Sequence, residues 1–245
     1  MRELVAGRGN SAQEGPPNFY RLQKVFNEAD LWPLTAAETT VQTFLGIRMQ
    51  CAKCHNHPFE RWTQDDYYGF AAWFARVKQR PESGAKPNTP NTAEVVFTAR
   101  DGEVTQPRTG KTMKPRMLSV GDADLPPGTD RREALADWLT SPGNPFFAKS
   151  VANRVWFHVM GKGIVDPVDD FRESNPAAND ELLDALAKDF VKSGFDHKKL
   201  VKTIMKSRTY QLSAQPTETN RDDTKYFSHA VTKLLTAEQL LDALC

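Results

Sequence analysis

The sequence predicts a mainly α-helical protein that has one short β-hairpin near residues 94–106. Apolar residues recur at helical spacing over most of the chain, and residues typical of helix caps precede these runs. Only Val95–Phe97 has the β-branched and aromatic character of a strand, and the turn dipeptide Asp101-Gly102 follows it before Val104. Helices are therefore expected to form the body of the protein, with the hairpin as a small excursion.

The first two predicted helices flank a cysteine cluster. Thr35, with Glu38 three residues later, fits a capping box that opens a helix over about 35–50. Thr63 fits the cap of a second helix, because the acidic pair Asp65-Asp66 occupies its first turn. This second helix is unusually aromatic and is expected to end before Pro81.

Cap signals return in the second half of the chain. Asp130 opens a helix that stops at Ser141-Pro142, and Asn144-Pro145 combines a cap with a proline in the first turn. The remaining predicted helices are 144–160, 180–192, 198–207 and about 229–244.

Composition along the chain predicts the domain organisation. Residues 1–18 are expected to form a flexible lead-in, and 19–80 a helical domain that carries the cysteine cluster. Residues 81–128, rich in Pro, Gly and Lys, are expected to be a linker that contains the hairpin. Residues 129–245 then form a second helical domain. Because neither end of the chain has a clear stop, it is expected to be an internal piece of a longer protein.

Charge and hydropathy exclude several classes of protein. The 245 residues hold 32 Lys and Arg against 31 Asp and Glu, so a basic nucleic-acid-binding domain is not indicated. No apolar run reaches the length of a membrane span, and residues 1–30 lack the apolar segment of a signal peptide. Three cysteines are too few for a disulfide-rich scaffold. A globular protein without a nucleic-acid partner or a membrane span is expected.

The segment Cys51-Ala52-Lys53-Cys54-His55 fits the attachment pattern of c-type haem. Two thiols at this spacing can form thioethers with the two vinyl groups of a porphyrin. The following histidine can then reach the iron as the proximal ligand. The pattern thus predicts haem c held by Cys51 and Cys54, with His55 as the metal ligand.

The same atoms allow three other interpretations. Zinc could bind Cys51, Cys54, His55 and His57, although tetrahedral sites usually draw on two separated pairs of ligands. The two cysteines could form a reversible disulfide, although the redox motif of that type follows a strand rather than a helix. They could also be plain structural thiols. His57 lies too close to His55 to reach the other face of the same haem.

A second axial ligand could come from the helix predicted over 144–160. His158 and Arg154 lie one turn apart on its otherwise apolar stripe. His158 is thus a candidate distal ligand, and Arg154 a candidate partner for a haem propionate. The plainer alternative is a core histidine bonded to the main chain and an arginine in a salt bridge.

Two other groups of residues favour structural roles. The acidic segment Asp166–Asp170 does not match a calcium-binding loop, and we expect Asp170 to cap the loop or pair with Arg172. The aromatic residues around the second helix are expected to pack in a core. No catalytic fingerprint is present, so no catalytic residue is assigned and the question of enzymatic activity stays open.

Several longer motifs resemble a known pair of families. Residues 44–59 and 62–70 resemble the cytochrome-c-associated domain of unknown function that is abundant in planctomycete-type bacteria. Its usual C-terminal companion domain has motifs that resemble residues 144–147, 153–158, 161–171 and 207–212. The resemblance implies a large exported protein, often with a separate cytochrome c domain upstream. It implies no established catalytic residue.

These observations lead to two hypotheses. The first is an extracytoplasmic haem c domain of a larger protein that transfers electrons to a redox partner or to a fused cytochrome c domain. The second is a non-haem scaffold or carbohydrate-associated binding module, in which the cysteine pair forms a disulfide or zinc staple.

Overall fold

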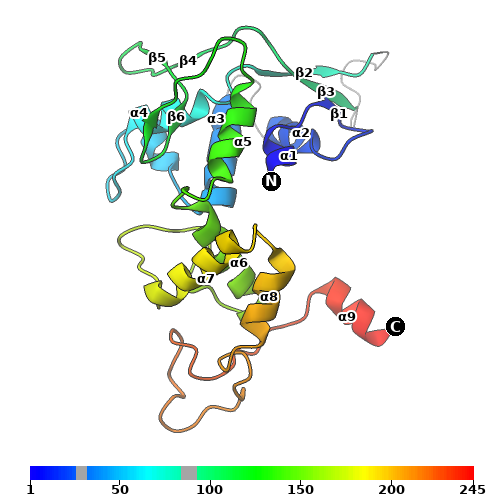
Figure 1. Ribbon diagram of the computed structural model, residues 1–245, viewed down its shortest axis with the longest axis vertical. Helices are drawn as coiled ribbons and strands as arrows, with labels where there is room; N and C mark the ends of the chain where they lie inside the picture. The colour runs from blue at the N-terminus through cyan, green and yellow to red at the C-terminus, as the bar shows by residue number, and fades with distance from the viewer. Residues whose placement is uncertain (26–31, 84–92) are drawn as a thin grey trace. The chain divides into compact units, whose positions relative to one another are not determined.

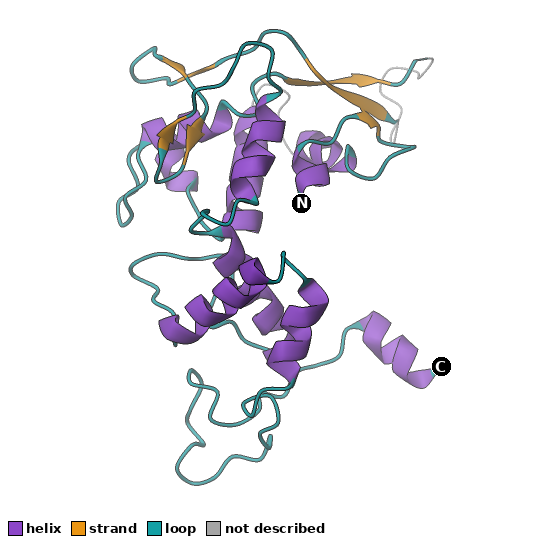
Figure 2. Ribbon diagram, viewed as in Figure 1, coloured by secondary structure: helices purple, strands orange, loops and turns teal. Residues whose placement is uncertain are grey.

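The computed structural model describes residues 1–25, 32–83 and 93–245, and it divides the chain into two compact units. Unit 1 comprises Met1–Phe147 and unit 2 comprises Ala148–Cys245. All the strands in the described part of the chain lie in unit 1 (Figure 2). The predicted fold class is confirmed, because the protein is mainly helical and its strands form small sheets.

Unit 1 is built from short helices around an aromatic core (Figure 1). Its helices are α1 (Arg2–Val5), α2 (Asn18–Val25), α3 (Trp32–Thr40), α4 (Gln64–Ala71) and α5 (Arg131–Leu139). A π-helical turn, η1 (Val41–Leu45), continues α3, and a 3₁₀ turn, η2 (Gln50–Lys53), carries the first cysteine. The expected start of the first helix at Thr35 is wrong, since Thr35 lies inside α3.

The strands of unit 1 form three small antiparallel sheets. Strands β1 (Gly9–Asn10), β3 (Glu94–Thr98) and β2 (Val77–Pro81) pair in that order, with Val77 opposite Thr98. Strand β4 (Val104–Thr105) pairs with β5 (Thr112–Met113), and β6 (Arg116–Met117) pairs with β7 (Gly121–Asp122). The strand predicted at Val95–Phe97 exists, but its partners are β1 and β2 rather than the residues around Val104. Local pattern predicts a strand and leaves its partner undetermined.

The segment expected to be a lead-in, and the described residues 81–83 and 93–128 of the expected linker, are packed into unit 1. In the first, Val5 is fully buried and its carbonyl accepts a hydrogen bond from the Tyr20 hydroxyl. In the second, Leu118 is fully buried and the carbonyl of Arg116 accepts a 2.9 Å hydrogen bond from Trp73 Nε1. The described residues of both segments are packed here because they bury apolar side chains and form hydrogen bonds with residues of the helical core.

The aromatic helix packs in the core of unit 1, as predicted. Phe70 lies against Trp138 of α5, with ring centroids 6.5 Å apart. Thr63 caps α4 through a complete capping box with Asp66, which confirms the predicted start. The buried aromatic residues of this region are Trp62, Tyr67, Tyr68, Phe70, Trp73 and Phe74.

Unit 2 is helical around its own core. Its elements are most of α6 (Phe147–Met160), then α7 (Asp180–Lys192), α8 (His197–Met205) and α9 (Ala237–Leu244). The predicted bounds of α7 and the predicted cap of α8 are confirmed, since Asp196 Oδ1 accepts a 3.0 Å bond from Lys199 N. The last predicted helix is shorter than expected, because Thr236 caps it. The core holds Ala152, Trp156, Ile164, Leu183, Phe190, Leu200 and Ile204.

Candidate functional site

The cysteine motif lies on a turn whose apolar residues point inward. Gly46 ends η1 with a φ of 70°, a left-handed conformation that glycine adopts without steric cost. Met49 and Ala52 are then buried, at 1% and 0% exposure. Cys51 and Cys54 are exposed, and both thiols are free. The turn therefore fixes its apolar side in unit 1 and presents the two sulfurs outward.

Two residues of α4, one turn apart, hold the motif in place. The carbonyl of Lys53 accepts hydrogen bonds from Tyr68 Oη at 2.9 Å and from Gln64 Nε2 at 3.3 Å. Asn56 Oδ1 accepts a 3.0 Å bond from the backbone N–H of Gln64. The sequence did not predict the roles of Asn56 and Gln64. Gln64 is recognisable only as a polar residue at the start of an aromatic helix, and Asn56 only as a polar residue in the segment before it, so neither pattern identifies a bonding partner.

The two histidines of the segment have different local roles. His55 is exposed, and its Nδ1 lies 2.7 Å from the carbonyl oxygen of Asn56. A carbonyl oxygen only accepts, so Nδ1 is the donor, and in the neutral ring the lone pair is then on Nε2. His57 Nδ1 instead accepts a 3.2 Å bond from Phe59 N, and its backbone N–H donates to Trp62 O. His57 thus shapes the turn that leads to α4.

Two tyrosines beside the motif stay protonated at neutral pH. Burial raises the pKa of Tyr67, and the hydrogen bond from its hydroxyl to Glu38 raises that pKa further. The pKa of Tyr68 is also raised, first by burial and then by the charges of Cys54 and Glu38. Both phenols therefore act as hydrogen-bond donors. Tyr68 is the donor that reaches the motif.

The side chains considered for zinc are not brought together. Among the described residues, no group of three His, Cys, Asp or Glu side chains is arranged to hold a metal ion. A tetrahedral zinc shell needs all its donor atoms within about 2.3 Å of one point. Haem attachment has a looser requirement, because only the histidine approaches the iron and the cysteines bond to the porphyrin edge. The two exposed thiols and the exposed His55 on one turn are compatible with that requirement.

The candidate residues of unit 2 lie on α6. His158 is exposed, its ring centroid lies 5.4 Å from that of Phe157, and its carbonyl accepts a bond from Lys233 Nζ. The expected alternative of a core position for His158 is wrong. Arg154 is half-buried. Because the cysteine motif is in unit 1, distal ligation by His158 and propionate binding by Arg154 stay predictions.

The acidic segment after α6 has the structural role that its sequence predicts. Asp170 is buried and forms a 2.9 Å ion pair with Arg172. Asn153 of α6 reaches the same loop, where its amide bonds the carbonyl and the N–H of Val165 at 2.8 and 2.9 Å. The loop is thereby fixed to α6.

Two segments of the chain match family models. Residues 1–79 match the family model PSCyt2, described as a protein of unknown function (DUF1549). Residues 131–245 match PSD1, also described as a protein of unknown function (DUF1553). The two matches support the predicted domain pairing. The PSCyt2 match includes the cysteine motif, and the PSD1 match includes α5, which lies in unit 1.

Other comparisons add no relative. Neither the curated proteins nor the solved structures contain a match to this chain. Within the described ranges, no helix has the length and apolar character needed to cross a membrane.

Proposed function

We propose that unit 1 carries a covalently attached haem c on Cys51 and Cys54, with His55 as the proximal ligand, and serves in electron transfer. The observation that carries this proposal is the state of His55. Its Nδ1 lies 2.7 Å from the Asn56 carbonyl oxygen, so that in the neutral ring Nε2 is the nitrogen left for a metal, and the same turn carries two exposed free thiols. Histidine ligands in proteins commonly donate their second ring N–H to such an acceptor, which fixes the tautomer.

The cysteines fit the chemistry of attachment. Each thiol adds its sulfur and its hydrogen across one vinyl double bond, so the reaction needs no oxidant. Both sulfurs must be accessible from the same side, and the burial of Ala52 between them supports this presentation. Bound haem supplies one-electron transfer. The hydrogen bonds from Tyr68 and Gln64 to Lys53 keep the turn rigid, which limits reorganisation around the histidine.

The proposal also includes the location of the protein and its electron partner. Thioether attachment takes place outside the cytoplasm, so the mature protein is extracytoplasmic, as part of a longer exported chain. Its electron partner is a separate redox protein or a cytochrome c domain fused upstream. The name PSCyt2 is consistent with a cytochrome-associated role. The sequence-based candidates of unit 2 are His158 as distal ligand, which is tested separately below, and Arg154 as propionate partner.

The test is production of the 245-residue chain together with a haem c maturation system. We expect a haem-stained band on a denaturing gel and a pyridine haemochrome spectrum of the thioether type. The double variant Cys51→Ser/Cys54→Ser should lose the stain. Cys245→Ser is the matched control, because Cys245 is also an exposed free cysteine and should leave the stain unchanged.

Further variants assign the iron ligands. His55→Ala should shift the haem spectrum to that of a form without its proximal imidazole, whereas His57→Ala should not. His158→Ala tests the distal role through the loss of a low-spin spectrum. A polypeptide of bare mass with stoichiometric zinc, or with a Cys51–Cys54 disulfide and no metal, would refute the haem proposal in favour of a staple.

A further inference from the structure

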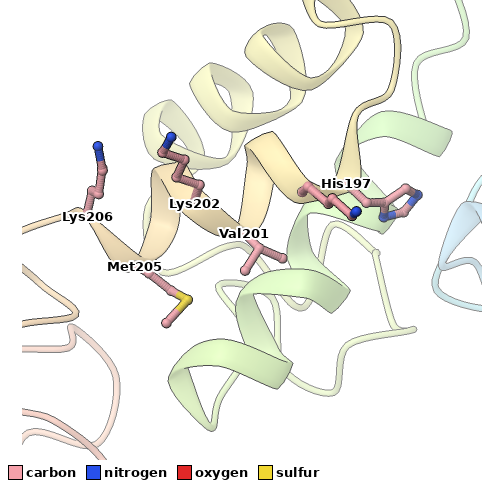
Figure 3. Close-up of a pocket in the computed structure, with 6 residues that line it drawn as sticks. His197, Val201, Lys202, Met205 and Lys206 are labelled. Atoms are coloured by element: carbon pink, nitrogen blue, oxygen red, sulfur yellow. The ribbon is translucent and has the colours of Figure 1, made fainter.

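The helix α8 of unit 2 presents an apolar strip that the rest of the unit does not cover. Leu200 and Ile204 face the core, at 1% exposure each, but Met205 is 44% exposed and Val201 is half-buried. Figure 3 shows Val201 and Met205 on the same side of α8, where they line a shallow groove of about 430 Å³. Such a groove can accept an apolar side chain of a partner.

A row of lysines borders this strip. Lys198, Lys202 and Lys206 follow one another at intervals of four residues, so they lie along one flank of α8. The groove therefore combines an apolar floor with a positively charged edge. An occupant that fits it needs an apolar stripe with acidic residues one turn apart along one side.

The C-terminal segment of the same chain has those properties. Leu240, Leu241 and Leu244 form a stripe on α9 and are 50%, 62% and 77% exposed. Glu238 and Asp242 lie one turn apart on one flank of that stripe. No residue of α9 is buried, although an amphipathic helix is stable mainly through burial of its apolar face.

An extended arm carries α9 away from the body of unit 2. Lys233 is bonded to the carbonyls of His158 and Val159 at the end of α6, and residues 231–236 form no regular structure. Figure 1 shows α9 beyond this arm, apart from α8 of the same unit. Val231, Leu234 and Leu235 of the arm are exposed as well. Among the described residues, none covers the apolar face of α9, and exchange of such an element between two copies is a low-cost route to a dimer.

We infer that two copies of this chain exchange their C-terminal arms, so that α9 of one copy lies on the α8 groove of the other. The contact is reciprocal and closed, because each copy provides one arm and one groove. The leucines supply the affinity. Exposed ion pairs add little binding energy, so the lysine row contributes little to the affinity. It faces Glu238 and Asp242 and thereby sets the orientation of α9.

The first test is the oligomeric state of the 245-residue chain, measured by light scattering after size exclusion over a range of concentrations. We expect a dimer. Leu241→Asp and Met205→Asp should each weaken dimerisation at least tenfold. Ala243→Asp introduces the same charge into α9 off the leucine stripe, so this matched control should keep the dimer.

Mixing the two variants distinguishes exchange from any other contact. The Met205→Asp copy has an intact arm, and the Leu241→Asp copy has an intact groove. Together they should form a heterodimer under conditions in which each alone is monomeric. The charge pattern is tested separately. Glu238→Lys/Asp242→Lys should weaken the dimer, because these lysines then face the lysine row of α8. Addition of Lys198→Glu/Lys202→Glu to that variant should restore the dimer.

Three results would overturn the inference. One is a chain that stays monomeric at every concentration. This includes a monomer whose α9 is protected from hydrogen exchange, because α9 would then be packed within its own copy. Another is a dimer that neither Leu241→Asp nor Met205→Asp weakens. The third is a monomer whose lysine row binds vesicles of anionic lipid, which would assign the groove to a membrane surface.

Discussion

The hydroxyl of Tyr68 donates a 2.9 Å hydrogen bond to the backbone carbonyl of Lys53, between the two cysteines of the motif. This bond joins the aromatic core of unit 1 to the turn that presents the thiols. The raised pKa of Tyr68 keeps the donor protonated over the whole neutral range.

Tyr68→Phe should therefore loosen the motif without disturbing the core. The ring still packs, but the Lys53 carbonyl keeps only the longer bond from Gln64. We expect a loss of about 1 kcal/mol in the free energy of unfolding. Amide hydrogen exchange over 51–56 should be faster. Tyr210→Phe, at an exposed tyrosine, is the control, and equal effects of the two variants would contradict the role of Tyr68.

Thr63→Ala should destabilise α4. Thr63 Oγ1 accepts from Asp66 N and the Asp66 carboxylate accepts from Thr63 N, so the substitution removes the side-chain half of the capping box and keeps only the bond from the backbone N–H of residue 63. We expect a cost of about 1 kcal/mol, measured by urea denaturation. Thr203→Ala, at an exposed position inside α8, should not destabilise the protein, because alanine has the higher helix propensity.

Arg132→Met should be among the most damaging substitutions in unit 1. The Arg132 side chain is 1% exposed and bonds the Gly7 carbonyl, Thr98 Oγ1 and the Asp130 carboxylate. Its removal leaves Asp130, whose side chain is 11% exposed, with only the longer 3.8 Å contact from Arg8 and the hydroxyl of Thr98, at a cost of about 3 kcal/mol. Thermal unfolding checks this, with the exposed Arg108→Met as control. Arg132→Met/Asp130→Asn should recover part of the loss, and no recovery would argue against the uncompensated charge.

The same pair predicts acid sensitivity. Burial alone raises the pKa of Asp130, but the hydrogen bonds and charge of Arg132 outweigh it and hold that pKa below its usual value. The stabilisation is complete above the ordinary aspartate pKa of about 3.9 and is lost as pH falls through the lower folded-state pKa. Unfolding free energy should thus fall less steeply below about pH 4 in Asp130→Asn than in the wild type. Asp101→Asn should keep the wild-type slope.

Asn153→Ala should release the loop after α6. Asn153 is fully buried, and its amide satisfies both backbone groups of Val165. Alanine leaves two buried backbone groups unpaired, which should cost about 2–4 kcal/mol. Proteolysis of 161–171 would report the release. Gln215→Ala, at an exposed position, is the control, and an Asn153 variant that resists proteolysis as well as the wild type would refute the prediction.

The sequence by itself determined the local features of this protein. Caps at Thr63, Asp130 and Asp196 predicted where helices begin, because a side chain near a helix N-terminus satisfies backbone N–H groups only a few residues away. Helical spacing predicted the burial of the aromatic residues of α4 for the same local reason. The C-x-x-C-H pattern named Cys51, Cys54 and His55 as candidate site residues.

Only the tertiary structure decided which distant segments meet. Strand β3 pairs with β1 and β2 rather than with the residues around Val104, and α5 packs in unit 1 although it falls within the match to the companion family. The bonds that fix the motif run from Gln64 and Tyr68 to Lys53, and the tautomer of His55 depends on the Asn56 carbonyl. These outcomes depend on which buried polar and apolar groups satisfy one another across the fold, and no local pattern contains that information.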